Sequence, residues 1–184
     1  NQRGGATLKQ FRRMYEQTHA QALVEINAGK KNGCWSWWIW PVSTRDLRTG
    51  SSAQRKLYSL TDEEARAFLA DGYLRDKWLE IMTAVYTQLS GGIHYKILAT
   101  GTNKIDDSWC LVATCKLFQG ITSGTNYPVV NNVCTNILNL IRQQQHKATS
   151  GPSPSPSPSP SPNEQKLIEM GFPQELARET LLKT

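Results

Sequence analysis

A run of alternating serine and proline near the C-terminus constrains this chain more than any other feature. Residues 151–162 read GPSPSPSPSPSP, with proline at every second position. Proline fixes φ and has no backbone N–H, so this run favours a hydrated, extended rod over packed structure. At about 3.1 Å per residue, the rod reaches on the order of 37 Å. The sequence therefore predicts a linker over residues 147–163, which separates residues 7–146 from residues 164–184.

The first of these two parts has helical periodicity along most of its length. Apolar residues recur at three- and four-residue steps from Leu8 to Ile26, between a candidate cap at Thr7 and a candidate terminator at Gly29. The pattern of residues 93–101 fits either a short strand or a loop. Helix-start signals or the same spacing recur in four further segments, residues 61–72, 74–89, 106–120 and 128–145. We predict an all-α fold: a single multihelical globular domain, then a Ser-Pro linker and a short C-terminal helical hairpin.

Four of the six tryptophans lie in residues 34–41, CWSWWIWP. This segment has neither the helical period nor strict alternation, and Pro41 disfavours helix at the residue before it. We expect it to run between helices, buried on more than one side, with its indole N–H groups bonded to carbonyl oxygens. The alternative is a pocket in which lysines and an arginine bind an anion while indoles stack on a nucleotide-like ligand. Its candidate residues are Lys30, Lys31, Trp35, Trp37, Trp38 and Arg45.

Composition narrows the classes of function. The net charge of +6 suits a soluble protein better than a dedicated nucleic-acid binder, so nucleic acid is not an expected partner. The apolar runs are shorter than the roughly 20 residues of a membrane span. The four cysteines lie in apolar, helix-like segments, which favours reduced, buried thiols in the cytoplasm or nucleus. Cys110 and Cys115 lack the spacing of a zinc site, and we expect no metal or cofactor.

The sequence contains no recognisable catalytic motif. The histidines do not stand beside a serine or cysteine in a nucleophile motif, and no phosphate-cradling glycine loop is present. Asp106 and Asp107 directly precede a predicted helix, so capping is a simpler role for them than catalysis. The sequence accordingly favours a binding protein over an enzyme.

Three segments resemble the family catalogued as domain of unknown function 1810, over roughly residues 8–145. They are ALVEINAGKKNGCWSWWIWP, YSLTDEEARAFL and DDSWCLVATCKLF. In that family an EI-x-x-G-K helix end leads into HWMWFIFPQ. Cys34 stands where the family has histidine, Trp40 where it has phenylalanine and Val42 where it has glutamine. The resemblance implies a helical fold and carries no activity with it.

Residues 163–184, NEQKLIEMGFPQELARETLLKT, resemble the start of a ubiquitin-associated (UBA) domain, in which an MGF loop follows the first helix. The usual domain is longer, so either the protein continues past Thr184 or another surface supplies the third helix. A helical hairpin without a partner is the alternative. The resemblance implies weak binding of the hydrophobic patch of ubiquitin, or of a ubiquitin-like protein, through Met170, Gly171, Phe172, Leu181 and Leu182.

These observations lead to one interpretation and one alternative. We interpret the chain as a two-part interaction protein, in which a helical domain of unknown ligand is tethered to a module that binds ubiquitin. The alternative is an enzyme or a binder of a small, nucleotide-like ligand, centred on residues 30–45.

Overall fold

The computed structural model describes residues 5–149, and the side chains of residues 5–147. The chain divides into two compact units, Asn1–Leu138 and Asn139–Thr184. Within the second unit the described residues are the C-terminal half of one helix. Most of the predicted linker and all of the predicted hairpin, residues 164–184, lie outside the described residues, so both stay predictions.

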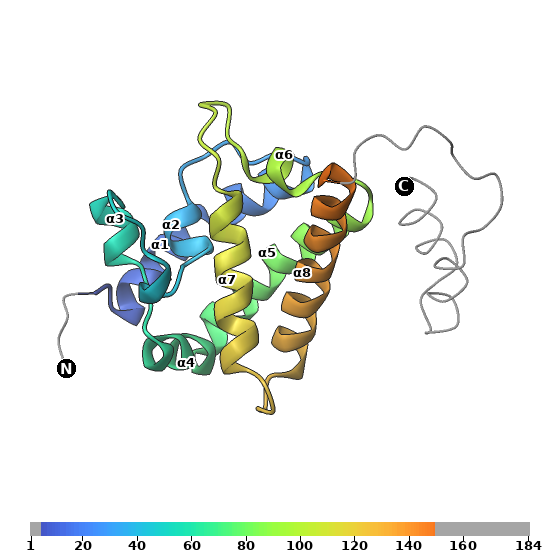
Figure 1. The fold of residues 1–184 in the computed structure, drawn as a ribbon. Helices are drawn as coiled ribbons and strands as arrows, with labels where there is room; N and C mark the ends of the chain where they lie inside the picture. The colour runs from blue at the N-terminus through green and yellow to red at the C-terminus, as the bar shows by residue number, and fades with distance from the viewer. Residues whose placement is uncertain (1–4, 150–184) are drawn as a thin grey trace, which may run out of the picture. The chain divides into compact units, whose positions relative to one another are not determined.

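Residues 5–149 are helical, as predicted, and contain no extended strand (Figure 1). The only strand-like pairings in this range are isolated bridges, Ser43 with Leu60 and Thr100 with Asp106. Within the same range no helix is both long enough and apolar enough to cross a membrane. The helices are α1 (Leu8–Asn27), α2 (Ser36–Ile39), α3 (Ala53–Leu57), α4 (Asp62–Ala70), α5 (Gly72–Ser90), α6 (Tyr95–Ala99), α7 (Ser108–Ile121) and α8 (Pro128–Thr149), with a 3-10 turn η1 (Thr44–Asp46).

Helix α1 begins and ends where its sequence signals predict. The Gln10 amide donates to Thr7 Oγ1 at 3.2 Å, and the Thr7 amide donates to Gln10 Oε1 at 2.7 Å, which completes a capping box. Gly29 adopts φ 89°, a left-handed conformation that ends the helix at little steric cost. One face of α1, which includes Phe11, Tyr15 and Ile26, is fully buried and packs chiefly against α5.

The remaining long helices also match the periodicity. Helix α4 begins at the predicted capping box of Thr61 and Glu64. Gly72 does not end it: α4 stops at Ala70, and Gly72 is the first residue of α5, because the Asp71 side chain caps the new helix through the Leu74 amide. Helices α7 and α8 follow the last two patterns. The Gln119 side chain of α7 donates to Thr135 Oγ1 of α8 at 2.9 Å.

Most of the elements that were not predicted from the sequence are short helices. Residues 93–101 contain helix α6, so the expectation of a strand or loop was wrong at Tyr95–Ala99. The sequence also gave no indication of α3, which has only five residues. A helix of this length is held by its surroundings, since one or two turns are unstable in isolation. Both short helices deliver residues to the region around the tryptophans.

The tryptophan segment is largely buried, as expected, but it includes one helical turn, α2. Trp40 is fully buried and ends that turn directly before Pro41. The expected carbonyl partners were wrong for two indoles: Trp35 Nε1 donates to a carboxylate oxygen of Glu25 at 2.9 Å, and Trp38 Nε1 donates to a hydroxyl, Thr18 Oγ1, at 2.8 Å. The segment is therefore anchored by side chains of α1.

The cysteines divide into one exposed and three buried thiols. Cys110, Cys115 and Cys134 are fully buried in α7 and α8, as expected. Cys34 is exposed, which corrects the prediction of a buried thiol at that position. It lies in the turn before α2, where its two neighbours, Gly33 and Trp35, both donate to the Glu25 carboxylate.

Candidate functional site

The loop that follows α1 is organised by one carboxylate. Glu25 Oε1 accepts from the amides of Asn32 and Gly33 at 2.6 and 2.7 Å and from the Trp35 indole, while Oε2 accepts from Gln21 at 2.7 Å. Partial burial raises the pKa of Glu25, but these hydrogen bonds together hold the pKa below its usual value. Glu25 therefore stays ionised and ties the loop back onto α1.

Close packing around Glu25 explains the glycine in this loop. A Cβ at Gly33 would lie 2.5 Å from Gln21 Nε2, 3.0 Å from Trp35 Cδ1 and 3.1 Å from Glu25 Oε2. These distances are at or below the limit of contact, so a larger residue would have to displace the side chains that hold the turn. Gly33 thus permits the approach of the backbone to the carboxylate.

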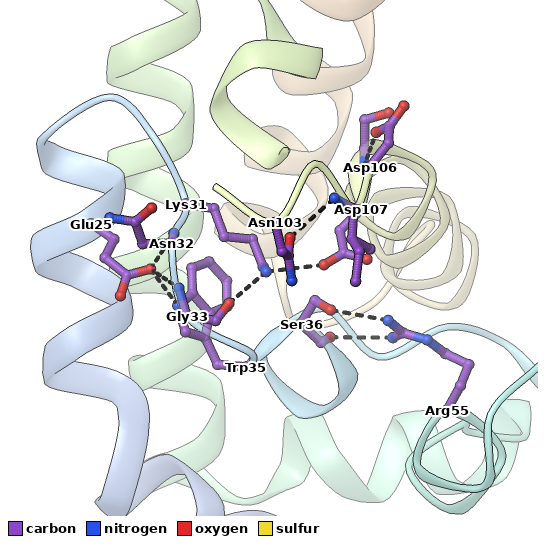
Figure 2. Close-up of polar contacts among 12 residues, drawn as sticks. Glu25, Lys31, Asn32, Gly33, Trp35, Ser36, Arg55, Asn103, Asp106 and Asp107 are labelled. Carbon is purple, nitrogen blue, oxygen red and sulfur yellow. Dashed lines mark hydrogen bonds and ion pairs between the residues drawn. The ribbon is translucent and has the colours of Figure 1, made fainter. Parts of the chain in front are cut away.

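Lys31 points into the domain (Figure 2). The residue is only 4% exposed, and its backbone amide donates to the Leu98 carbonyl at 2.8 Å. Its ammonium donates to the Gly33 carbonyl at 2.6 Å, pairs with Asp107 Oδ2 at 3.0 Å and lies 5.2 Å from the centre of the Trp35 ring. The lysine charge is neutralised inside the fold, and the ion pair joins the loop after α1 to the start of α7.

The two neighbouring aspartates have different roles, although the sequence suggested capping for both. Asp106 Oδ1 accepts from the Ser108 amide at 2.8 Å, at the beginning of α7. Asp107 is the N-cap residue, but its side chain makes no capping hydrogen bond, and its carboxylate pairs with Lys31 instead. Capping was therefore the wrong role for the Asp107 side chain.

A second buried cation, Arg55 of α3, lies beside the same segment (Figure 2). It is 5% exposed, and its guanidinium donates to the carbonyl and the hydroxyl of Ser36 at 3.3 and 3.0 Å. Burial lowers the pKa of Arg55, and the charge of Asp107 and the thiol of Cys110 oppose this effect. Among the described residues no carboxylate lies within ion-pair distance of it. Arg55 is a buried charge with neutral hydrogen-bond partners.

Trp109 of α7 connects Arg55 to the surface. The Arg55 guanidinium carbon lies 5.4 Å from the centre of this partly exposed ring, and that of Arg48, an exposed residue, lies 4.3 Å from it. Cys110 follows Trp109, and burial raises the pKa of its thiol to about 12 despite the nearby Arg55. The thiol is therefore neutral, and it does not balance the arginine charge.

The residues predicted to form a ligand pocket are only partly brought together. Lys31 contacts the Trp35 ring, and the Trp37 and Trp38 rings lie 5.6 Å apart. Trp35 and Trp38 are 1% and 4% exposed, so their faces are covered by the protein itself. Trp37 is partly exposed, and Lys30 is exposed at the end of α1.

Arg45 lies apart from the other candidates, since its guanidinium pairs with Asp62 Oδ1 at 2.9 Å. The sequence reasoning missed Glu25, Arg48, Arg55 and Trp109 as members of this region. The residue types alone did not distinguish Arg55 from the other arginines. The predicted ubiquitin-binding residues, Met170, Gly171, Phe172, Leu181 and Leu182, lie outside the described residues.

A metal centre and a surface groove are the other kinds of site to consider within residues 5–149. No group of three or more histidine, cysteine, aspartate or glutamate side chains in this range is arranged to hold a metal ion. A groove between α1 and α5, lined in part by Leu23, Leu79 and Glu80, is the surface hollow that these helices form. The charged region around Trp35 and Trp109 therefore remains the candidate site.

A family model described as "Protein of unknown function (DUF1810)" matches residues 5–148. The chain belongs to this family. The DUF1810 domain is also similar to a solved structure, the crystal structure of the conserved hypothetical protein Rv1873 from Mycobacterium tuberculosis, with a TM-score of 0.59 and 22% sequence identity. The match covers 72% of this chain and 84% of that one, and at this identity it shows a common fold. No curated protein matches the chain.

These matches confirm the resemblance stated for the helical part. The whole charged region, from Glu25 to Trp109, lies within the DUF1810 domain. At Cys34, where the family pattern has histidine, this chain presents an exposed thiol to solvent. The resemblance of residues 163–184 to a UBA domain stays a prediction.

Proposed function

We propose that this protein is a two-part interaction protein, in which residues 164–184 bind ubiquitin or a ubiquitin-like protein and the DUF1810 domain binds a second ligand. The observation that supports the first half most strongly is the stretch LIEMGFPQELARETL, which follows the order of apolar, glycine and helix-forming residues at the start of a UBA domain. A proline-rich linker precedes it, as a tethered module requires.

The chemistry of the contact follows from the residue types. Met170 and Phe172 flank Gly171, so two large apolar side chains stand on either side of a residue that permits a tight turn. Leu181 and Leu182 supply further apolar surface. A contact this small buries little area, so the complex is weak and transient. We further propose a reducing compartment, the cytoplasm or nucleus, which is consistent with free thiols at all four cysteines.

The test is a titration of unlabelled ubiquitin into the full-length, ¹⁵N-labelled chain. We expect the amide resonances of residues 164–184 to shift and those of residues 5–138 to stay in place. Phe172→Ala should abolish the shifts, whereas Lys183→Ala, a change in the same segment outside the apolar residues, should retain them. Unchanged spectra at millimolar ubiquitin would contradict the proposal, as would equal binding by the Phe172→Ala variant.

A second candidate is a small, nucleotide-like ligand at residues 30–45, and one observation favours it. Trp37 keeps part of its surface exposed in a segment whose other three indoles are buried. Tryptophan fluorescence of the wild-type chain and of Trp37→Phe, measured against a panel of nucleotides, tests this candidate. Quenching that is lost in the variant supports it, and emission that is unchanged across the panel contradicts it.

A further inference from the structure

Arg55 differs from the neighbouring cations because no carboxylate of residues 5–147 lies within ion-pair distance of it. Lys31 is paired with Asp107 at 3.0 Å, and Arg45 is paired with Asp62 at 2.9 Å. Arg55 is 5% exposed and bonds only to the neutral atoms of Ser36. Removing an ionised group from water is costly, and proteins usually offset the cost with a counter-charge. Asp107 attracts Arg55 electrostatically, but its carboxylate is paired with Lys31, so among the described residues no carboxylate lies within ion-pair distance of Arg55.

Arg48 gives the region a second cation on the solvent side. Its guanidinium carbon lies 4.3 Å from the centre of the Trp109 ring, the same ring that Arg55 approaches to 5.4 Å. A guanidinium stacked on an indole loses freedom while its edge N–H groups stay available. Two guanidinium groups therefore lie close to a single indole, one from an exposed residue and one from a buried residue.

The backbone around Arg48 places it there. The Arg48 amide donates to Ser51 Oγ at 2.9 Å, and the Ser51 amide and hydroxyl both donate to the Arg48 carbonyl, at 3.0 and 2.7 Å. Gly50 closes this turn with φ 84°, and no atom lies within 4 Å of the position that a Cβ there would occupy. The turn is thus locally fixed, and it is open to solvent on the side that a Gly50 Cβ would face.

The local charges suggest the class of ligand. Lys31 and Asp107 cancel each other, which leaves the two positive charges of Arg48 and Arg55. In Figure 2 the Asp106 side chain lies away from Arg55, and its carboxylate is engaged by Ser108. A phosphate monoester is a dianion near neutral pH, and its oxygens match the planar fork of a guanidinium.

We propose that Arg48 and Arg55, arranged around Trp109, form a binding site for the phosphate group of a small phosphate monoester. Arg48 receives the group at the surface, and Arg55 supplies the buried charge that the ligand neutralises. The partly exposed Trp109 indole lies against the ligand and reports its presence. The proposed site uses none of residues 164–184, so a failure of phosphate binding and a failure of ubiquitin binding are distinguishable.

The experiment is a titration of the full-length, ¹⁵N-labelled chain with inorganic phosphate and with a nucleoside monophosphate, in buffers matched in ionic strength with sodium chloride. We expect saturable shifts of the Trp109 indole N–H and the Arg55 side-chain N–H resonances. If the nucleotide binds more tightly than inorganic phosphate, the site also contacts the part of the ligand beyond the phosphate group. If the two bind equally, the site recognises the phosphate group alone. Either result supports the site.

Two arginine variants separate this site from general charge effects. Arg48→Gln removes an exposed cation, so the protein should stay folded while the dissociation constant rises about tenfold or more. Arg45→Gln removes an exposed cation that is already paired with Asp62, and it should bind phosphate like the wild type. The proposal is overturned if both variants bind equally well, or if sodium chloride alone reproduces the shifts.

Discussion

Lys31 and Arg55 are both buried cations in the DUF1810 domain, and only one of them has a counter-ion. Lys31 pairs with Asp107 and bonds to the Gly33 carbonyl, so its charge forms part of the fold. Arg55 has the hydroxyl and carbonyl of Ser36 in place of a carboxylate. Lys31 therefore carries a charge that holds two segments together, whereas Arg55 carries a buried charge without a carboxylate partner of its own among the described residues. We assign a structural role to Lys31 and a ligand-binding role to Arg55.

Asp107→Asn removes the counter-ion of Lys31, so that Lys31, like Arg55, has no carboxylate partner in the described part of the chain. We expect this variant to show the largest loss of stability. Breaking one partner of a buried ion pair leaves the other charge unpaired, so the free energy of unfolding should fall by about 3 kcal/mol. Urea denaturation measures this change. The matched control is Asp106→Asn, whose amide oxygen can still accept from the Ser108 amide, with an expected change within about 0.5 kcal/mol. Equal losses in both variants would contradict the assigned role of Asp107.

Glu25→Gln weakens the loop that carries Lys31, with an expected loss of about 2 kcal/mol, because charged acceptors make stronger hydrogen bonds than amides. The native pKa of Glu25 is lowered, so its contribution is present above the unfolded pKa, near 4.3, and is lost as pH falls through the native value. The variant should therefore lose less stability on acidification. Denaturation at a series of pH values measures this slope, with exposed Glu16→Gln as the control. If the stability of Glu25→Gln fell as steeply with decreasing pH as that of the wild type, the assigned role of Glu25 would be wrong.

Ser36→Ala has the smallest expected effect, because Arg55 loses one neutral partner and keeps the carbonyl. We expect a loss of about 1 kcal/mol in urea denaturation. In an Arg55→Met background the same change should cost close to nothing, since the hydroxyl then has no guanidinium to bond. An equal cost in both backgrounds would mean that the hydroxyl acts independently of Arg55.

Much of the fold could be predicted from the sequence because its signals are local. The Thr7 and Thr61 capping boxes and the apolar spacing of α1, α5, α7 and α8 each act within a few residues. Helices α2, α3 and α6 have four or five residues, too few to establish a period. They form because the surrounding helices cover them, and this information is not contained in any short stretch of sequence.

The candidate site was harder to predict than the fold. Lys30 and Lys31 are adjacent and chemically identical, yet Lys30 is exposed and Lys31 is 4% exposed. What separates them is Asp107, far away in the sequence. Arg55 is similar, since nothing in AQRKL distinguishes its arginine from one on the surface. The tryptophan segment does lie beside these charged groups, since Trp35 contacts Lys31 and Ser36 bonds to Arg55.

The most direct test of this comparison is the stability of Lys31→Met beside that of Arg55→Met, measured by urea denaturation in buffer without phosphate. Both changes replace a buried cation by an apolar side chain of similar length. We predict that Lys31→Met loses about 3 kcal/mol, because Asp107 is left buried and unpaired. Arg55→Met should equal or exceed the stability of the wild type, because it strands no charge. Equal and large losses in the two variants would contradict the account, since Arg55 would then be structural as well.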